Sequence, residues 1–262
     1  MSRDSKYASY PSLEGRVVVI SGGATGIGAS MVEAFAAQRA QVVFLDILSD
    51  AATVLIQELT DLKVAHSPIY YECDMTNIEG GVKPTAAKIL ARFPHVHVLI
   101  NNAASDTRQK MMEITEELWD QSAAINVRHQ FFLTQSLMPG LIASGSASVI
   151  NMGSIAWTIQ SFDIVPYATS KAAIVGLTKM LAHELGPQGV RVNSIMPGAI
   201  ATDRQLRDVL TPDVQAHIMK QQALKRMLQP AEVARMALWL AADDSAGVTN
   251  QSMVIDAGWI SW

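Results

Sequence analysis

The sequence predicts an α/β fold built on a doubly wound, seven-stranded parallel sheet with helices on both faces. Short β-branched runs recur along the chain, helical patterns fill most gaps between them, and no linker, repeat or low-complexity segment divides it. This alternation implies parallel strands, because right-handed crossovers carry each helix back over the sheet. The strand-like runs lie near residues 16–21, 41–46, 68–73, 96–101, 147–152, 190–195 and 252–256.

The composition is typical of one soluble, core-rich domain. Of the 262 residues, 49% are hydrophobic and 17% charged, so we expect residues 1–262 to share a single core. The net charge of −4, without a basic run, argues against nucleic-acid and anionic-membrane partners. The lone Cys73 excludes an intramolecular disulfide. Because neither a signal peptide nor a membrane-spanning stretch is evident, a cytoplasmic location is expected.

The first strand-like run passes directly into Gly22-x-x-x-Gly26-x-Gly28 and then into a helical pattern. Strand, glycine turn and helix in this order are typical of the dinucleotide-binding site of a Rossmann fold. Glycines let the backbone turn sharply and approach a pyrophosphate, and the helix N-terminus offers free N–H groups. A glycine triplet alone also occurs in flexible loops, and this spacing differs from Gly-x-Gly-x-x-Gly. The flanking strand and helix therefore carry the assignment.

The second strand-like run ends in Asp46, near the distance at which a dinucleotide site places its ribose-binding acid. A carboxylate there accepts hydrogen bonds from both ribose hydroxyls and repels a 2′-phosphate. No lysine or arginine between Ser21 and Gln38 offsets that repulsion, so the prediction is NAD over NADP. The alternative is that Asp46 only caps the turn that contains Ser49 and Asp50.

Helical patterns are expected over 114–143, as two helices, over 167–186 and over 230–242. Residues 1–12 precede the first strand as an N-terminal extension. Residues 198–228 form a long insertion at the carboxyl end of a strand, where a substrate lid would belong.

A catalytic constellation is predicted from Ser154, Tyr167 and Lys171. Ser154 follows a strand and so lies at the carboxyl edge of the sheet, and the other two are one helical turn apart on one face. Lowering the tyrosine pKa from about 10 by roughly three units requires on the order of 4 kcal/mol. A neighbouring ammonium and an oxidised nicotinamide could supply it, making Tyr167 a general base for hydride-transfer chemistry. Taken alone, a Tyr-x-x-x-Lys pair is usually only a helix surface; Ser154 and the glycine loop decide for catalysis.

With these residues in view, the chain resembles the short-chain dehydrogenase/reductase family, of its compact type, from about Ser12 to Trp259. The matching segments are Ser21–Gly28, Asp74, Asn101–Ala104, Asn126, Ser154, Tyr167, Lys171 and Pro197-Gly198-x-x-x-Thr202. Two departures are Ser21, where the family usually has threonine, and Ala104, where it usually has glycine. The serine keeps a hydroxyl, and the alanine affects only the shape of the cofactor pocket.

The resemblance implies roles for further residues. Asp74 would bind the adenine amino group, Asn126 would anchor a water that passes the proton to solvent, and Thr202 would contact the nicotinamide carboxamide. Asn126, Ser154, Tyr167 and Lys171 are the implied catalytic residues. The implied cofactor-binding residues are Gly22, Thr25, Gly26, Ile27, Gly28, Asp46, Ile47, Asp74, Met75, Asn102, Ala103, Ala104, Tyr167, Lys171, Pro197, Gly198, Ile200 and Thr202.

Within this family the chain is most similar to bacterial aldose 1-dehydrogenases, in segments around the predicted cleft such as Asn126–Gln130 and Asn151–Trp157. Polar groups and an indole in that cleft suit a sugar, whose hydroxyls pair with arginine and amides while its C–H face lies on the ring. Alternatively, the arginines are surface cations and Trp259 belongs to the core. The candidate substrate-binding residues are Asp106, Arg108, Ser154, Trp157, Gln160, Tyr167, Arg204, Gln205 and Trp259.

The leading hypothesis is NAD-dependent oxidation of an aldose at its anomeric C1 to the aldonolactone. The alternatives are a secondary alcohol on a keto-deoxy sugar acid, a 3-oxoacyl reductase, and a non-catalytic dinucleotide-sensing protein. Asp46 and the lack of a basic docking patch count against the 3-oxoacyl reductase, and the predicted catalytic residues count against the non-catalytic protein. No metal site is predicted, since His95-x-His97 fits a structural role. The family implies a homotetramer, and we expect the aromatic tail 259–262 to contact a neighbouring subunit.

Overall fold

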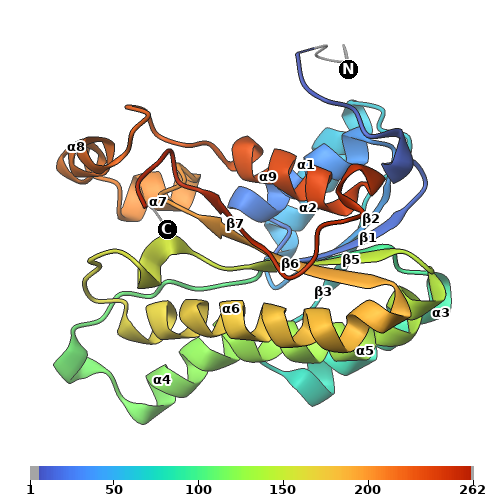
Figure 1. The fold of residues 1–262 in the computed structure, drawn as a ribbon, viewed down its shortest axis with the longest axis horizontal. Helices are drawn as coiled ribbons and strands as arrows, with labels where there is room; N and C mark the ends of the chain where they lie inside the picture. Colours follow the sequence, from blue (N-terminus) through green and yellow to red (C-terminus); the bar gives the residue numbers. More distant parts are fainter. Residues whose placement is uncertain (1–5, 261–262) are drawn as a thin grey trace.

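The computed structural model describes residues 6–260 and confirms the predicted α/β class. Seven parallel strands form one sheet in the order β3-β2-β1-β4-β5-β6-β7 (Figure 1). The order reverses between β1 and β4, which opens a crevice at their carboxyl ends, where such folds bind ligands. The strands are β1 (Val17–Ser21), β2 (Gln41–Asp46), β3 (Ile69–Glu72), β4 (Val98–Asn101), β5 (Ala147–Met152), β6 (Val190–Pro197) and β7 (Ser252–Ile255).

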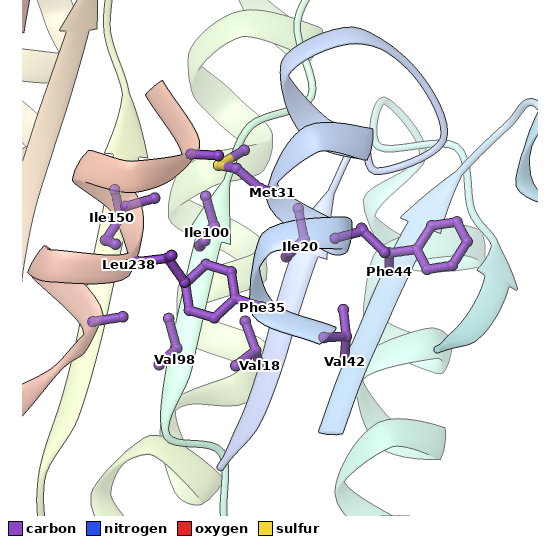
Figure 2. Packing of buried hydrophobic residues seen from close by; sticks show 14 of the residues in the cluster. Val18, Ile20, Met31, Phe35, Val42, Phe44, Val98, Ile100, Ile150 and Leu238 are labelled. Carbon is purple, nitrogen blue, oxygen red and sulfur yellow. The ribbon is translucent and has the colours of Figure 1, made fainter. Parts of the chain in front are cut away.

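Helices cover the sheet on both faces, so the central strands β1, β4 and β5 are wholly buried. One layer holds α1 (Gly26–Ala37), α2 (Ser49–Asp61) and α9 (Pro230–Ala241). The other holds α3 (Lys83–Arg92), α5 (His129–Ala143) and α6 (Val165–Leu185). In Figure 2, Phe35 of α1 and Leu238 of α9 pack on strand residues such as Val18 and Val98.

The stretch predicted as two helices is one continuous helical run. It begins as α4 (Glu116–Ala123), widens into a π-helical turn (Ala124–Arg128) and continues as α5. The Gln130 side chain donates to the Asn126 carbonyl oxygen at 3.1 Å inside this turn. π-helical turns of this kind are frequent at functional sites.

The predicted insertion contains two helices, α7 (Asp203–Asp208) and α8 (Pro212–Gln221), before α9 resumes the core layer. A single parallel bridge between Ile200 and Leu228 closes its base. The remaining short turns are Pro11–Leu13, Ile78–Val82, Met111–Glu113, Ile155–Trp157, Gly186–Gln188 and Asp243–Ser245. No helix in the described part of the chain is long and apolar enough to cross a membrane.

Candidate active site and dinucleotide-binding site

The glycine loop lies at the crevice between β1 and β4, and its conformation requires glycine. Gly22 and Gly26 have φ of 66° and 58°, in the left-handed region. A Cβ on Gly28 would lie 1.8 Å from the Gly22 carbonyl oxygen, and one on Gly22 would lie 2.7 Å from the Ala103 Cα. The loop therefore presents bare backbone at the start of α1, the arrangement that a pyrophosphate needs.

Asn102 and Ser21 join this loop to the end of β4. The Ser21 hydroxyl accepts hydrogen bonds from the backbone N–H groups of Asn102 at 3.0 Å and Ala103 at 3.1 Å. The Asn102 amide donates to the carbonyl oxygens of Ser21 at 3.1 Å and Gly22 at 2.8 Å. A serine hydroxyl thus suffices where the family usually has threonine. Ala104, the other departure, is exposed and beyond these bonds.

The Asp46 carboxylate makes two sets of contacts, one with the turn before α2 and one with the glycine loop. Its carboxylate accepts from the N–H groups of Ile47 at 2.8 Å and Leu48 at 3.1 Å, which caps the turn before α2. The same carboxylate accepts from the Ala24 N–H, inside the glycine loop, at 2.9 Å. Capping therefore does not remove the negative charge from the crevice; it holds that charge beside the loop.

The other implied cofactor residues surround the same crevice. Asp74 is exposed after β3 and accepts from the Thr76 backbone N–H at 2.8 Å, while Met75 is buried. Thr202 caps α7, and its methyl group would lie 3.3 Å from a Cβ on Gly26. The segment that follows β6 therefore lies next to the glycine loop. This glycine cradle with an acid at its rim fits a nicotinamide dinucleotide.

Ser154, Tyr167 and Lys171 meet at the carboxyl end of β5. The Ser154 hydroxyl accepts from the Ala156 N–H at 3.0 Å and hydrogen-bonds the Tyr167 side chain. The Lys171 Nζ lies 5.5 Å from the centroid of the Tyr167 ring and donates to the Met152 carbonyl oxygen at 2.7 Å. Tyrosine and lysine occupy one face of α6, whose first turn contains Pro166.

Burial controls the ionisation of this pair. It raises the pKa of Tyr167 to about 12, against the opposing effect of the Ser154 hydrogen bond. It lowers the pKa of Lys171 to about 7, against the opposing charge of Asp106. The protein without cofactor thus holds a neutral phenol. Conversion to a general base requires added positive charge at the phenolate.

Asn126 is fully buried in the π-helical turn and fixes the loop after β4. Its side-chain oxygen accepts from the Ser105 N–H at 3.0 Å, and its amide donates to the Ser105 carbonyl oxygen at 2.9 Å. The sequence analysis did not assign His129 and Gln130, which are both fully buried one turn later. Polar residues three and four positions after Asn126, on the core face of a helix, were the signal that could have identified them.

On the opposite side of the crevice, Asp106 contacts two other residues that were predicted to bind substrate. Its largely buried carboxylate accepts from the Arg204 guanidinium and, at 2.8 Å, from the Gln205 amide. Burial raises the pKa of Asp106, but the hydrogen bonds from Arg204 and Gln205 and the charges of Arg204 and Arg108 outweigh it, so the net pKa lies below its usual value. Asp106 thus binds α7 to the loop after β4.

The other predicted substrate residues are more dispersed. Trp157 lines a cavity of about 410 Å³ together with Ala168 and Thr169, the residues that follow Tyr167 on α6. Gln160 is exposed, and Trp259 is partly buried. The second half of the predicted aromatic tail, residues 261–262, lies outside the described residues. The structure therefore assembles Asp106, Arg204 and Gln205 into a cluster but leaves Trp157 and Gln160 at the margin.

The paired histidines contact the backbone. The His97 Nδ1 accepts from the Val17 N–H at 3.1 Å, and the His95 Nδ1 lies 2.9 Å from the Ala143 carbonyl oxygen. Both therefore have structural hydrogen bonds. Within residues 6–260, no group of three or more His, Cys, Asp or Glu side chains could hold a metal ion.

Comparison with known proteins agrees with this geometry. A family model described as enoyl-(acyl carrier protein) reductase matches residues 22–260. A probable galactose dehydrogenase of Rhizobium meliloti (strain 1021) is 42% identical over 96% of this chain and 97% of its own. The D-xylose 1-dehydrogenase of Caulobacter vibrioides (strain NA1000 / CB15N) is 42% identical over 96% and 98%.

Among solved structures, a 3-oxoacyl-[acyl-carrier protein] reductase with bound NAD from Brucella melitensis superposes with a TM-score of 0.85. It is 30% identical and covers 96% of this chain and 94% of its own. The fold, the glycine cradle, the cluster of Ser154, Tyr167 and Lys171, and the relatives agree. The chain belongs to the short-chain dehydrogenase/reductase family and is an oxidoreductase that uses a nicotinamide dinucleotide.

Proposed function

We propose that this protein is an NAD-dependent dehydrogenase that oxidises the anomeric hydroxyl of a neutral aldose to the aldonolactone. The observation that carries the proposal is the Ser154–Tyr167–Lys171 geometry facing a polar cluster of Asp106, Arg204 and Gln205. The sugar dehydrogenases that share 42% of its residues support an aldose as substrate.

In the proposed mechanism, Tyr167 and Ser154 act on the same substrate oxygen, and Lys171 acts on Tyr167. Tyr167 removes the proton from the anomeric hydroxyl as the C1=O bond of the lactone forms, and the Ser154 hydroxyl holds that oxygen as charge develops. The Lys171 ammonium, packed over the tyrosine ring, favours the phenolate. The bound dinucleotide supplies the acceptor for the hydride that leaves C1.

The choice of NAD rests on Asp46. Its carboxylate is held at the glycine loop by the Ala24 N–H, where a 2′-phosphate would meet a fixed negative charge. The expected result is a much higher kcat/KM with NAD than with NADP. An Asp46→Ser variant should narrow that preference mainly by losing affinity for NAD. Equal or better kcat/KM with NADP in the unaltered protein would contradict the assignment.

A neutral sugar is favoured over a sugar acid by the pairing of Arg204. Because its guanidinium is already bound to Asp106, its charge is compensated before any substrate enters. Neutral hydroxyls can still bind the outer faces of Asp106, Arg204 and Gln205. We further propose that residues 198–228 act as the substrate lid, since α7 carries two members of this cluster.

The deciding assay is NADH formation by purified protein on a panel of pentoses, hexoses, deoxysugars and sugar acids. Turnover on neutral aldoses, with the lactone identified by its hydrolysis to the aldonic acid, would support the proposal and name the sugar. Activity confined to keto-deoxy acids would move the reaction to a secondary alcohol. Activity only on 3-oxoacyl thioesters would replace the proposal.

We also propose a homotetramer, as is usual in this family. Large apolar side chains are exposed on its central helices, including Trp119 of α4, Phe131 of α5 and Met180 of α6. Contiguous exposed apolar surface is typical of subunit interfaces. Sedimentation equilibrium at micromolar concentration should give four times the mass of the chain, and a monomer would refute this assembly.

A further inference from the structure

A buried polar seam runs between α5 and α6, starting at Lys171. In the part of the seam farther from Lys171, the side chains are hydrogen-bonded to one another. The Asn101 amide donates to the Thr134 hydroxyl at 3.0 Å and to the Asn151 side-chain oxygen at 2.8 Å, and the Asn151 amide donates to Thr178 at 3.0 Å. These residues are at most 1% exposed.

In the part of the seam beside Lys171, some buried polar atoms lack hydrogen-bond partners. His129 and Gln130 are fully buried. The His129 ring hydrogen-bonds the Ile125 backbone, but its other nitrogen and the Gln130 Oε1 have no hydrogen-bond partner among the described residues. A buried polar atom without a partner is destabilising, because it has lost its hydrogen bonds to water. Native proteins satisfy such atoms with internal water, which typically makes about three hydrogen bonds. Two unsatisfied polar atoms on two adjacent buried residues therefore point to a water between them.

This site is coupled to the catalytic lysine through shared contacts. The Met152 carbonyl oxygen accepts from the Lys171 Nζ at 2.7 Å and lies 3.5 Å from the Gln130 amide nitrogen. The same amide donates to the Asn126 carbonyl oxygen. The charge of Lys171 also lowers the pKa of His129, although burial contributes more, and the resulting value of about 3 keeps the imidazole neutral at working pH. An uncharged ring can accept a hydrogen bond from water without repelling the ammonium.

We propose that His129 and Gln130 hold a buried water against Lys171, and that this water solvates the ammonium and keeps it charged during catalysis. Both are positioning residues, since they act on the reaction only through Lys171. The inference rests on the proposed dehydrogenase function for its kinetic test but not for the presence of the water.

The groups around Lys171 and Tyr167 determine in which direction the loss of the water would shift the pKa of each. Lys171 faces Tyr167 on its own helix, His129 on α5 and Asp106 from the loop after β4, while Arg108 and Arg204 act on Tyr167. Removing the water makes the ammonium less stable, so Lys171 loses its proton at lower pH. The phenolate of Tyr167 then loses its positive neighbour and forms only at higher pH.

The test uses the NAD-bound protein and the variants His129→Phe and Gln130→Met, which remove the polar atoms and keep similar side-chain volumes. We expect the midpoint of the rising limb of kcat against pH to move upward by about one unit. The plateau rate at high pH should be retained. His129→Gln, which restores a polar atom, should return the midpoint toward the unaltered value. Thr178→Val is the matched control: it removes a buried hydroxyl two turns along α6 and should leave the midpoint unchanged.

A high-resolution crystal structure gives the second readout. It should show an ordered water within hydrogen-bond distance of a His129 ring nitrogen and the Gln130 Oε1, and that water should be absent from the Gln130→Met variant. An empty site, or folded His129→Phe and Gln130→Met proteins with the original pH midpoint, would overturn the proposal. If the unaltered protein oxidises no aldose while the water is present, the proposed function fails and the water site stands.

Discussion

The two sides of the crevice are held together by different kinds of interaction. On the cofactor side, each hydrogen bond that joins the glycine loop, Ser21, Asn102 and Asp46 has a backbone N–H or carbonyl group as one partner. On the substrate side, Asp106 holds Arg204 and Gln205 through side chains, and the Arg204 side chain is 52% exposed. Backbone geometry suits a constant ligand, whereas exchangeable side chains allow the substrate preference to change without altering the fold.

The proposed catalytic residues lie between these two sides, and Tyr167→Phe should have the largest effect. It removes the only atom that accepts the substrate proton in the proposed mechanism, so we expect kcat to fall by roughly 10³-fold. Because the cofactor side is untouched, the Kd for NAD, measured by fluorescence titration, should stay within about twofold. Full turnover by this variant would relocate the chemistry.

Breaking the backbone geometry of the cofactor side should have the next largest effect. A methyl group in Gly28→Ala would collide with the Gly22 carbonyl oxygen, and such overpacking costs about 1–3 kcal/mol. The Kd for NAD should rise by up to roughly a hundredfold.

Gly176→Ala provides the control for that substitution. Gly176 lies on the exposed face of α6, with nothing within 4 Å of an added Cβ. Replacement there should stabilise the protein by about 0.5–1 kcal/mol in urea unfolding without changing NAD affinity. Unaltered binding in Gly28→Ala would show that the loop can relax.

The pH dependence sharpens the role of the residues between the two sides. Oxidation needs the phenolate, and burial raises the pKa of Tyr167 to about 12 in the protein without cofactor. The rate of aldose oxidation should therefore increase with pH, by about tenfold per unit below the operative pKa. Lactone reduction with NADH needs the phenol and should decrease over the same range. Parallel profiles in both directions would exclude Tyr167 as the titrating group.

On the substrate side, Asp106→Asn should have the smallest effect. It removes the charge that holds Arg204 and so loosens α7, but Arg204 is half exposed and its ion pair is screened by solvent. We expect about 1 kcal/mol, or roughly a fivefold rise in the KM for sugar, with the Kd for NAD unchanged. Arg207→Gln, which breaks an exposed pair with Asp208 on the same helix, is the control. A loss of NAD binding in Asp106→Asn would mean that the two sides are not independent.

Much of the cofactor side could be predicted from the sequence because its determinants are local. A β-branched run before three glycines and a helix defines a strand–turn–helix unit within about a dozen residues, and the structure reproduces it from Val17 to Ala37. Tyr167 and Lys171 are one turn apart on one helix, so their shared face follows from helical periodicity alone. The differences from expectation are shifts of one or two residues at element ends, such as the start of α6 before Tyr167, and the continuity of α4 with α5.

Contacts between distant segments were decided only by the tertiary structure. Asp106 meets Arg204 from 98 positions away, and His129 lies beside Lys171 across two helices. Periodicity shows which face of each element is buried, but it does not show which other element covers that face. The sequence by itself determined the class of fold and the placement of Tyr167 and Lys171 on one helical face. The packing of α5, α6 and α7 around the crevice decided which side chains surround that pair.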